Sequence, residues 1–368
     1  MPVAELPFAF YAIAAFVFGL LVGSFLNVVI WRVPRGESVA FPGSHCGSCG
    51  APVKPYDNIP LLSYAVLRGR CRACKANFSL IYPAVELLTG LLFLAVIFNS
   101  GPTWGAVAEM IFVAVMISLT FIDAQHQLLP NVITYPALLF AMCAGSFQTG
   151  FFSRSSIDFQ DALAGSLVGK AIVAPLLVAC AIPAFHLLDR MDDRLFGKYF
   201  EDDDTEEPEA AEEAEKRIRE QHQRVTRATM IMGFAVAVTL ALLAIIPGTF
   251  LNPALIAGLF RAAIGALIGG GIIWLLRAAY FLARGFEGMG LGDVKLMAVI
   301  GAFLGWQSAI LVIVIGSLLG SVVGLALARK SADGMKTALP FGVFLAPAAI
   351  FALFFGHSII QWYVGRFN

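Results

Sequence analysis

Residues 288–295 read Gly-Met-Gly-Leu-Gly-Asp-Val-Lys and lie between two long apolar segments. An aspartate inside a bilayer is energetically costly, so where it occurs it usually faces a cavity or a partner. A second aspartate, Asp123, closes an apolar run much earlier in the chain. Our hypothesis is that Asp123 and Asp293 meet and share one water molecule, and that the rest of the chain holds them at the membrane edge.

The composition is that of a membrane protein. Of the 368 residues, 59% are hydrophobic and only 14% are charged, and the mean hydropathy is +0.80. Average soluble domains carry about 25% charged residues. We therefore expect an all-α polytopic membrane protein with about 8–10 transmembrane helices in a lipid bilayer. The net charge of zero favours neither an acidic nor a basic partner, and we expect no nucleic acid as a partner.

Apolar runs recur along the whole chain. The first is long enough to span a membrane, and Glu5 stands where a cleavable signal peptide has basic residues, so we expect a retained helix. The run at 294–304 is short for a full crossing and is expected to be tilted, re-entrant or continuous with its neighbour. The runs lie at about 8–31, 81–98, 104–122, 131–150, 161–187, 229–247, 254–283, 294–304, 308–328 and 340–364.

Basic residues in the short loops predict the orientation, because cytoplasmic loops are enriched in Lys and Arg. Alternating crossings put nearly all of them on one side, with both aspartates on that side; Arg154 and Arg261 are exceptions. We therefore expect the polar segments to face the cytoplasm and both chain ends to lie outside. The residues concerned are Arg32, Arg35, Arg68, Arg70, Arg72, Lys75, Arg284, Lys295, Arg329, Lys330 and Lys336.

Two polar insertions interrupt the apolar pattern and suggest a division into five segments. Residues 201–215 contain ten acids and no base, and such a block is usually solvated, with a docking or regulatory role as the alternative. The expected segments are a first transmembrane helix (1–31), a cytoplasmic four-cysteine domain (32–80), membrane helices with the first aspartate (81–187), an acidic cytoplasmic loop (188–228) and membrane helices with the second aspartate (229–368).

Four of the six cysteines form two C-x-x-C pairs in one polar segment. The pairs Cys46–Cys49 and Cys71–Cys74 are separated by 21 residues, a spacing typical of a zinc-ribbon-like domain in which four thiolates hold a structural Zn²⁺. Gly47 and Gly50 suit the tight turns of such knuckles. The alternative, disulfides or free thiols, is less favoured in a reducing cytoplasmic loop. The remaining two, Cys143 and Cys180, are expected to be buried small hydrophobes.

The surroundings of Asp123 predict a helix end. Pro130 and several polar residues follow it in the stretch TFIDAQHQLLPN, 120–131. Taken alone, such an aspartate is more often an interfacial carboxylate or an N-terminal helix cap than a catalytic group. His126 is either a third titrating group or, more often, a hydrogen-bonded structural residue.

The second aspartate is preceded by glycines and followed by a cation. Gly290 and Gly292 leave the backbone uncovered, so that another helix or a substrate strand can approach it. Lys295 either lowers a neighbouring pKa or snorkels to the interface, and we favour snorkelling. Pro340 and Gly342 open the last apolar run, either as a helix start with Pro in its first turn or as an unwound edge that pairs with an extended peptide.

Two carboxylates about 3 Å from a shared water cannot both ionise easily, so they share one proton. The ionised member takes a proton from the water as it attacks a carbonyl group. The protonated member polarises that carbonyl. This chemistry hydrolyses a peptide bond without a covalent intermediate.

In order and chemistry, these motifs resemble the bacterial type IV prepilin peptidases. Those are membrane aspartic proteases with a G-x-G-D motif that act as leader peptidases and N-methyltransferases in pilus and type II secretion systems. The match covers most of 20–150 and 260–350. The similar stretches are GSFLNVVIWRVPRG (23–36), the CGSC and CRAC knuckles, DNIPLLSYAVLRGRCRAC (57–74), YPAVELLTG (82–90), FIDAQHQLLPN (121–131), GMGLGDVKLMAVIGAFLGW (288–306) and LPFGVFLAP (339–347).

The resemblance implies that Asp123 and Asp293 are the catalytic pair of a bacterial inner-membrane enzyme. The substrates would be prepilins or pseudopilins, cut on the cytoplasmic side after a glycine that ends a short basic leader. S-adenosylmethionine-dependent methylation of the new N-terminal amine is also implied, and the polar segment 32–80 is associated with it. Glu86 would receive the incoming ammonium or serve as an interfacial structural residue.

The chain departs from the family pattern in three places. Ile81 stands where a basic residue is common, which bears on the methyltransferase half. Asn131 stands where Asp is frequent after the proline, which suggests that a carboxylate there is dispensable. The segment from about 170 to 255 contains extra crossings and the acidic loop.

Two other classes of function remain open at this stage. A transporter or proton channel would also use two intramembrane carboxylates, although transporters often have inverted repeats and midplane sites, and here the aspartates lie at predicted helix ends. An assembly scaffold whose metal loop binds partners is the third reading.

Overall fold

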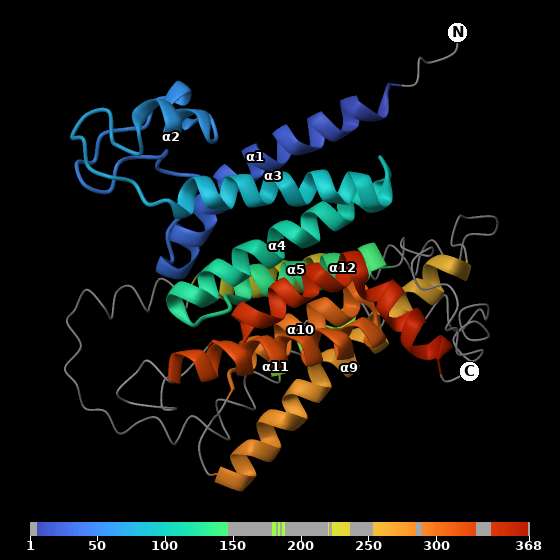
Figure 1. Ribbon diagram of the computed structural model, residues 1–368. Coiled ribbons are helices and arrows are strands. Elements are labelled where there is room, and N and C mark those ends of the chain that lie inside the picture. Colours follow the sequence, from blue (N-terminus) through green and yellow to red (C-terminus); the bar gives the residue numbers. More distant parts are fainter. Residues whose placement is uncertain are drawn as a thin grey trace. The chain divides into compact units, whose positions relative to one another are not determined.

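The computed structural model describes residues 6–145, 253–284, 289–328 and 340–366, together with short pieces between 179 and 187 and between 220 and 235. The elements named in these ranges are helices (Figure 1), which confirms the all-α prediction. They are α1 (Phe8–Arg32), η1 (Val33–Arg35), η2 (Pro55–Asn58), α2 (Leu62–Leu67), α3 (Ile81–Ser100), α4 (Trp104–His126), α5 (Asn131–Gly145), α9 (Pro253–Arg284), α10 (Leu291–Leu304), α11 (Trp306–Ala328) and α12 (Gly342–Gly365).

Six helices in the described part of the chain are long and apolar enough to cross a membrane. The predicted runs at 161–187 and 229–247 lie largely outside the described residues, as does the acidic segment 201–215. The chain divides into two compact units, one ending at His126 and the other beginning at Gln127. The predicted catalytic aspartates, Asp123 and Asp293, therefore belong to different units.

In the N-terminal unit, helices α1 and α3 pack so closely that their backbones are in contact. Buried positions of α1 recur every three or four residues from Ala12 to Ile30, which places them on one face of the helix. A Cβ atom on Gly23 would lie only 2.7 Å from the Cα atom of Glu86 on α3. Small residues allow this approach, as they commonly do between membrane helices. The same face of α1 therefore fixes both helix packing and the position of Glu86.

In the C-terminal unit, α10 is buried on every side. Every residue from Asp293 to Leu304 is buried, and helices α5, α9, α11 and α12 contact it. With 14 residues α10 is about 21 Å long, shorter than the roughly 30 Å hydrocarbon core of a bilayer. Of the three expectations for this short run, continuity with its neighbour is wrong, because the chain turns at Gly305, whose φ is 84°.

The contact between α9 and α10 is the tightest among the described glycines. A Cβ atom on Gly265 would lie 2.0 Å from the carbonyl oxygen of Gly301, and a Cβ atom on Gly301 would lie 2.0 Å from that of Gly265. Neither position has room for a methyl group. These two glycines therefore set the spacing of the helices around Asp293.

We predict that Gly301→Ala destabilises the protein by about 1–3 kcal/mol, because the added methyl group forces the two backbones apart. Gly271→Ala on α9 is the matched control, since a Cβ atom there meets nothing within 4 Å. Thermal unfolding of the two purified variants in detergent measures the difference. Equal melting temperatures for both variants would contradict the close contact.

Candidate active site and metal centre

The four cysteines of the two C-x-x-C pairs come together in the N-terminal unit. Their sulfur atoms all lie within 4.8 Å of one another, and the Sγ atoms of Cys46 and Cys74 are 3.8 Å apart. Two sulfurs bound at about 2.3 Å to one tetrahedral Zn²⁺ also lie about 3.8 Å apart. The cluster therefore has the donor set and the dimensions of a metal site with four thiolate ligands.

The two cysteine knuckles share one backbone pattern. Cys46 N–H donates to Ala51 O at 2.9 Å, and Cys71 N–H donates to Ala76 O at 2.8 Å. Gly50 in the first knuckle and Lys75 in the second occupy equivalent places, and both have a positive φ. The expected turn glycine is thus confirmed at Gly50, whereas Gly47 does not adopt this conformation. The turn falls after the second cysteine of each pair, so only a residue there needs it.

Without a metal, the thiols differ in acidity. Backbone N–H groups of Ser48 and Cys49 lower the pKa of Cys46 to about 6. For Cys74, the N–H of Ala76 lowers the pKa, but hydrogen bonds shared with the neighbouring thiols and burial raise it to about 11 overall. A metal that binds all four thiolates must therefore displace protons, so its affinity falls as the pH falls.

The remaining cysteines do not join the cluster. Cys143 is half-buried on α5, and Cys180 is exposed. The expectation that both are buried is wrong for Cys180.

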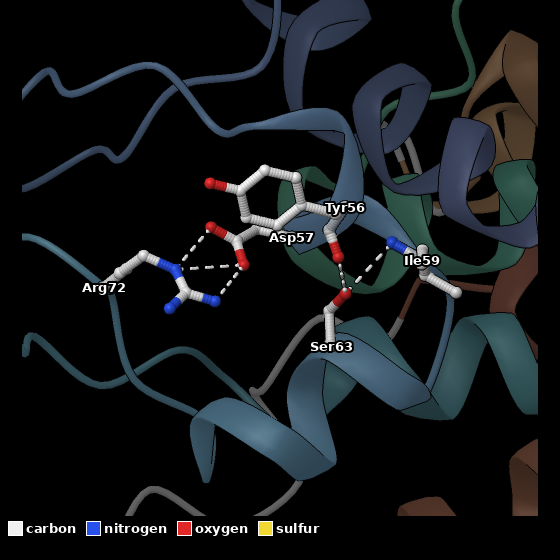
Figure 2. Close-up of polar contacts among 5 residues, drawn as sticks. All are labelled: Tyr56, Asp57, Ile59, Ser63 and Arg72. Atoms are coloured by element: carbon white, nitrogen blue, oxygen red, sulfur yellow. Dashed lines mark hydrogen bonds and ion pairs between the residues drawn. The ribbon is translucent and has the colours of Figure 1, made fainter.

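An ion pair ties the second knuckle to the η2 turn (Figure 2). Arg72 donates from Nη2 to Oδ1 of Asp57 at 2.6 Å and from Nε to Oδ2 at 2.8 Å. Hydrogen bonds from this guanidinium lower the pKa of the Asp57 carboxyl. The stabilisation is therefore present above the ordinary pKa of Asp and is lost as the pH falls through the lowered value. Ser63 closes the same turn, donating to Tyr56 O and accepting from Ile59 N–H, each at 3.0 Å.

Glu86 connects this polar segment to the membrane helices. It is buried in the second turn of α3, and its carboxylate accepts the N–H of Leu61 at 2.9 Å. Leu61 has a φ of 60°, an unusual conformation for a residue with a branched side chain. The carboxylate thus holds a strained backbone position that directly follows Pro60.

If the four cysteines hold zinc, as we expect, Cys49→Ser in the full-length protein should lose that metal and expose residues 32–80 to proteases, because a structural site depends on its complete ligand set. Elemental analysis and limited proteolysis measure the two effects. Cys143→Ser, a change of the same kind on α5, is the control and should keep the metal. Full zinc content in Cys49→Ser would contradict the four-thiolate centre.

Asp123 lies in the last turn of α4 and is only 4% exposed. The helix ends at His126, and the chain turns at Gln127, whose φ is 50°, before α5 begins at Asn131. The predicted helix break near Pro130 is confirmed. Of the alternatives for Asp123, the N-terminal cap is wrong, because this carboxylate stands at the opposite end of its helix.

Asp293 lies in the first turn of α10 and is 7% exposed. The helix follows Gly290, whose backbone is extended with φ −77° and ψ 153°. Backbone N–H groups at a helix N-terminus attract negative charge. A buried carboxylate at this place is therefore compatible with an ionised state.

The two glycines before Asp293 differ in their surroundings. A Cβ atom on Gly292 would lie 2.8 Å from the Cβ atom of Leu129, whereas one on Gly290 would come no closer than 3.8 Å to the backbone. Gly292 is therefore required by contact with the segment before α5. Among the described residues, none approaches Gly290 closely enough to require a glycine there.

Lys295 is buried and does not snorkel. Its Nζ atom donates to Oδ1 of Asn131 at 2.7 Å and lies 5.3 Å from the ring centroid of Tyr135. The prediction of snorkelling is wrong, because α5 offers a buried acceptor and an aromatic face. Asn131 thus takes part in the surroundings of Asp293 through an amide oxygen.

Arg277 is a residue that the sequence reasoning missed. It is buried on α9, and its Nε atom donates to the carbonyl oxygen of Met289 at 2.9 Å. This bond anchors the stretch that leads into α10 and Asp293. A buried arginine inside an apolar run was the signal available in the sequence, because such residues are usually functional or paired.

The last apolar run begins as a helix, α12, at Gly342, with Phe341 as its N-cap. Pro340 precedes the helix, so the expectation that Pro lies in its first turn is wrong. Leu339 lies outside the described residues. The interaction with an extended peptide at Pro340 and Gly342 stays a prediction, as does a titrating role for His126.

Comparison with known proteins covers almost the whole chain. A model of the bacterial peptidase A24 N-terminal domain matches residues 17–100, and a model of the type IV leader peptidase family matches residues 221–325. A prepilin leader peptidase/N-methyltransferase of Aeromonas hydrophila is 30% identical over 98% of this chain and 96% of its own length. The chain belongs to the prepilin leader peptidase/N-methyltransferase family.

Other relatives in the prepilin leader peptidase/N-methyltransferase family agree with this assignment. The protein of that name from Pseudomonas aeruginosa is 28% identical over 98% of this chain and 96% of its own length. The one from Myxococcus xanthus is 46% identical over 43% of this chain and 46% of its own length. No solved structure gives a significant match.

The two family models match different parts of the chain, and each matched range contains some of the candidate site residues. The N-terminal match contains the four cysteines and Glu86, and the second match contains Asp293 and Lys295. Asp123 lies between the two matched ranges and is covered by the near full-length relatives.

For this family member, we predict that Gly292→Ala lowers stability by about 1–3 kcal/mol, because the methyl group collides with Leu129. Gly290→Ala should leave the melting temperature unchanged, since the same added atom meets only ordinary contacts. Thermal unfolding of both variants in detergent provides the measurement. A larger loss for Gly290→Ala than for Gly292→Ala would refute the contact.

Proposed function

We propose that this protein is a membrane aspartic endopeptidase that removes the leader of type IV prepilins or pseudopilins and then methylates the new N-terminus. The observation that carries the proposal is the near full-length similarity to proteins named prepilin leader peptidase/N-methyltransferase. The burial of Asp123 and Asp293 at helix ends supports it, because buried carboxylates in membrane helices are costly and usually functional.

The helix ends suggest distinct roles for the two carboxylates. Asp293 lies in the first turn of α10, where the helix dipole favours an anion, and Asp123 lies in the last turn of α4, where it disfavours one. We assign Asp293 as the ionised general base and Asp123 as the protonated general acid. Lys295, held by Asn131, is a buried cation in the same helical turn as the base.

The reaction balances with these two groups alone. Asp293 takes a proton from water as the water oxygen bonds to the peptide carbonyl carbon, and Asp123 gives its proton to the carbonyl oxygen. The gem-diol then collapses, and the C–N bond breaks. The leaving nitrogen takes the proton from Asp293, and a hydroxyl proton returns to Asp123, which restores the pair.

The bilayer would supply much of the substrate specificity. The apolar helix of the prepilin would lie in the membrane, with its basic leader in the cytoplasm on the same side as the basic loops of the enzyme. The peptide bond to be cut must be unwound locally, because a helical backbone is shielded from attack. We accordingly propose that the protein lies in the bacterial inner membrane with both sites facing the cytoplasm.

Methylation is the second proposed reaction. S-adenosylmethionine supplies an electrophilic methyl group when it is bound. The lone pair of the new N-terminal amine forms the N–C bond, the S–C bond breaks with its electrons on sulfur, and the methylated ammonium releases a proton to water. Structural zinc at Cys46, Cys49, Cys71 and Cys74 holds the polar segment in shape, and the Leu61 contact favours a structural role for Glu86.

We predict that Asp123→Asn and Asp293→Asn each reduce leader cleavage at least about a hundredfold, because an amide replaces neither the acid nor the base. The mass of a prepilin incubated with each variant reports cleavage and methylation together. Glu109→Gln is the matched control, since Glu109 is a buried carboxylate of α4 that accepts a hydrogen bond from Ser100. Intact cleavage in both Asp variants would contradict the peptidase and favour a transporter.

A further inference from the structure

A cavity of about 260 Å³ opens in the N-terminal unit at the end of α1. One wall is a stripe of α1 that includes Ser24, Phe25 and Arg32. The loop 39–44 forms the opposite wall, and Asn58 of η2 closes one side. The lining therefore combines apolar side chains with hydroxyl, amide and guanidinium groups, which is the usual make-up of a small-molecule site.

Arg32 is held rigidly at this cavity. It is 7% exposed, and its Nη1 atom donates to Ser38 O at 3.0 Å and to Pro42 O at 2.7 Å, while Nη2 donates to Gly43 O at 3.3 Å. A guanidinium has five N–H donors. Three are engaged with the loop, so two are left for a ligand. The result is a preorganised cation that suits a carboxylate.

The cavity is also connected to α3. Ser24, which lines it, directly follows Gly23, where an added Cβ atom would lie 2.7 Å from the Cα atom of Glu86 on α3. Glu86 in turn accepts the N–H of Leu61. The cavity therefore lies beside the segment that joins the four-cysteine cluster to the membrane helices.

We propose that this cavity binds the amino-acid end of S-adenosylmethionine. The inference rests on the proposed methyl transfer. The α-carboxylate of the donor pairs with the two remaining N–H groups of Arg32. Its ammonium donates to the Ser44 hydroxyl and the Asn58 side-chain oxygen, and Phe25 and Val39 cover the apolar part. Since cavities for whole drug-sized ligands are typically about 300–1,000 Å³, the nucleoside extends through the open side.

Other ligands fit the lining less well. The free amine of a cleaved prepilin brings no carboxylate to pair with Arg32, whereas the amino-acid end of the methyl donor does. The headgroup of an anionic phospholipid needs a cation at the membrane surface, whereas Arg32 lies under the carbonyl groups of the loop. Arg35, which stacks on exposed Trp31 with its Cζ atom 3.6 Å from the ring centroid, suits a headgroup better.

The test uses the full-length protein in nanodiscs of zwitterionic lipid, with S-adenosyl-L-homocysteine as the probe and calorimetry as the measurement. Ala40→Trp fills the cavity and removes no side-chain hydrogen bond. We expect it to weaken binding of the probe at least about tenfold, while leader cleavage is unchanged. Val66→Trp, on an exposed face of α2 outside the cavity, is the matched control and should bind like the parent.

A second pair of variants tests the guanidinium group of Arg32, with zinc content as the readout for folding of the polar segment. Arg32→Lys keeps the positive charge but loses the paired N–H groups that bind a carboxylate. We expect weaker probe binding, with zinc content and leader cleavage intact. Arg35→Lys is its control and should bind like the parent. The mass of the processed prepilin should show cleaved but under-methylated product only for Ala40→Trp and Arg32→Lys.

The outcomes distinguish this inference from the proposed function. A parent protein that cleaves but never methylates would refute the proposed methyl transfer. Methylation by the parent with equal probe affinity in Ala40→Trp and Arg32→Lys would overturn the cavity as the donor site. Native mass spectrometry tests the alternative of a lipid site. Loss of a bound anionic phospholipid from Ala40→Trp, with unchanged probe affinity, would overturn the donor site in favour of a lipid site.

Discussion

The backbone contact between Gly265 on α9 and Gly301 on α10 sets the geometry on which the Asp293 site depends. Because α10 is buried on every side and shorter than the bilayer core, it is positioned by its neighbours and not by lipid. Its first turn carries Asp293, so the spacing of α9 and α10 decides where that carboxylate lies. Arg277 strengthens the same link, because it binds the carbonyl of Met289 just before the helix.

The N-terminal unit depends on a different kind of constraint. Large apolar side chains of its polar segment, such as Phe41, Leu62 and Val66, are exposed, so the four-cysteine cluster and a few charged contacts take the place of a hydrophobic core. Arg32 fixes the loop that follows α1, and Glu86 fixes Leu61. Both residues belong to membrane helices whose close packing is allowed by Gly19 and Gly23. Rigid membrane helices thereby hold a segment that has little core of its own.

Much of the site was predictable because its residues are chemically unusual for their surroundings. The two C-x-x-C pairs lie in one short polar segment, so their spacing alone predicted a shared site. The structure brings the four sulfur atoms together. Asp123 and Asp293 are costly in apolar runs, and both are buried at helix ends. The behaviour of Lys295 was not predictable, because its acceptor Asn131 lies 164 residues away in the chain.

Local chemistry in the sequence by itself determined the membrane class, the helical architecture, the four-cysteine cluster and the helix break after Asp123. Hydropathy, residue spacing and proline act over a few turns, so they can be read without knowing the fold. Only the tertiary structure decided that Gly292 faces Leu129, that Lys295 is buried against Asn131, that Arg277 anchors Met289 and that Arg32 lines a cavity. These contacts join segments distant in the chain, and their partners are selected by helix packing, which no local pattern encodes.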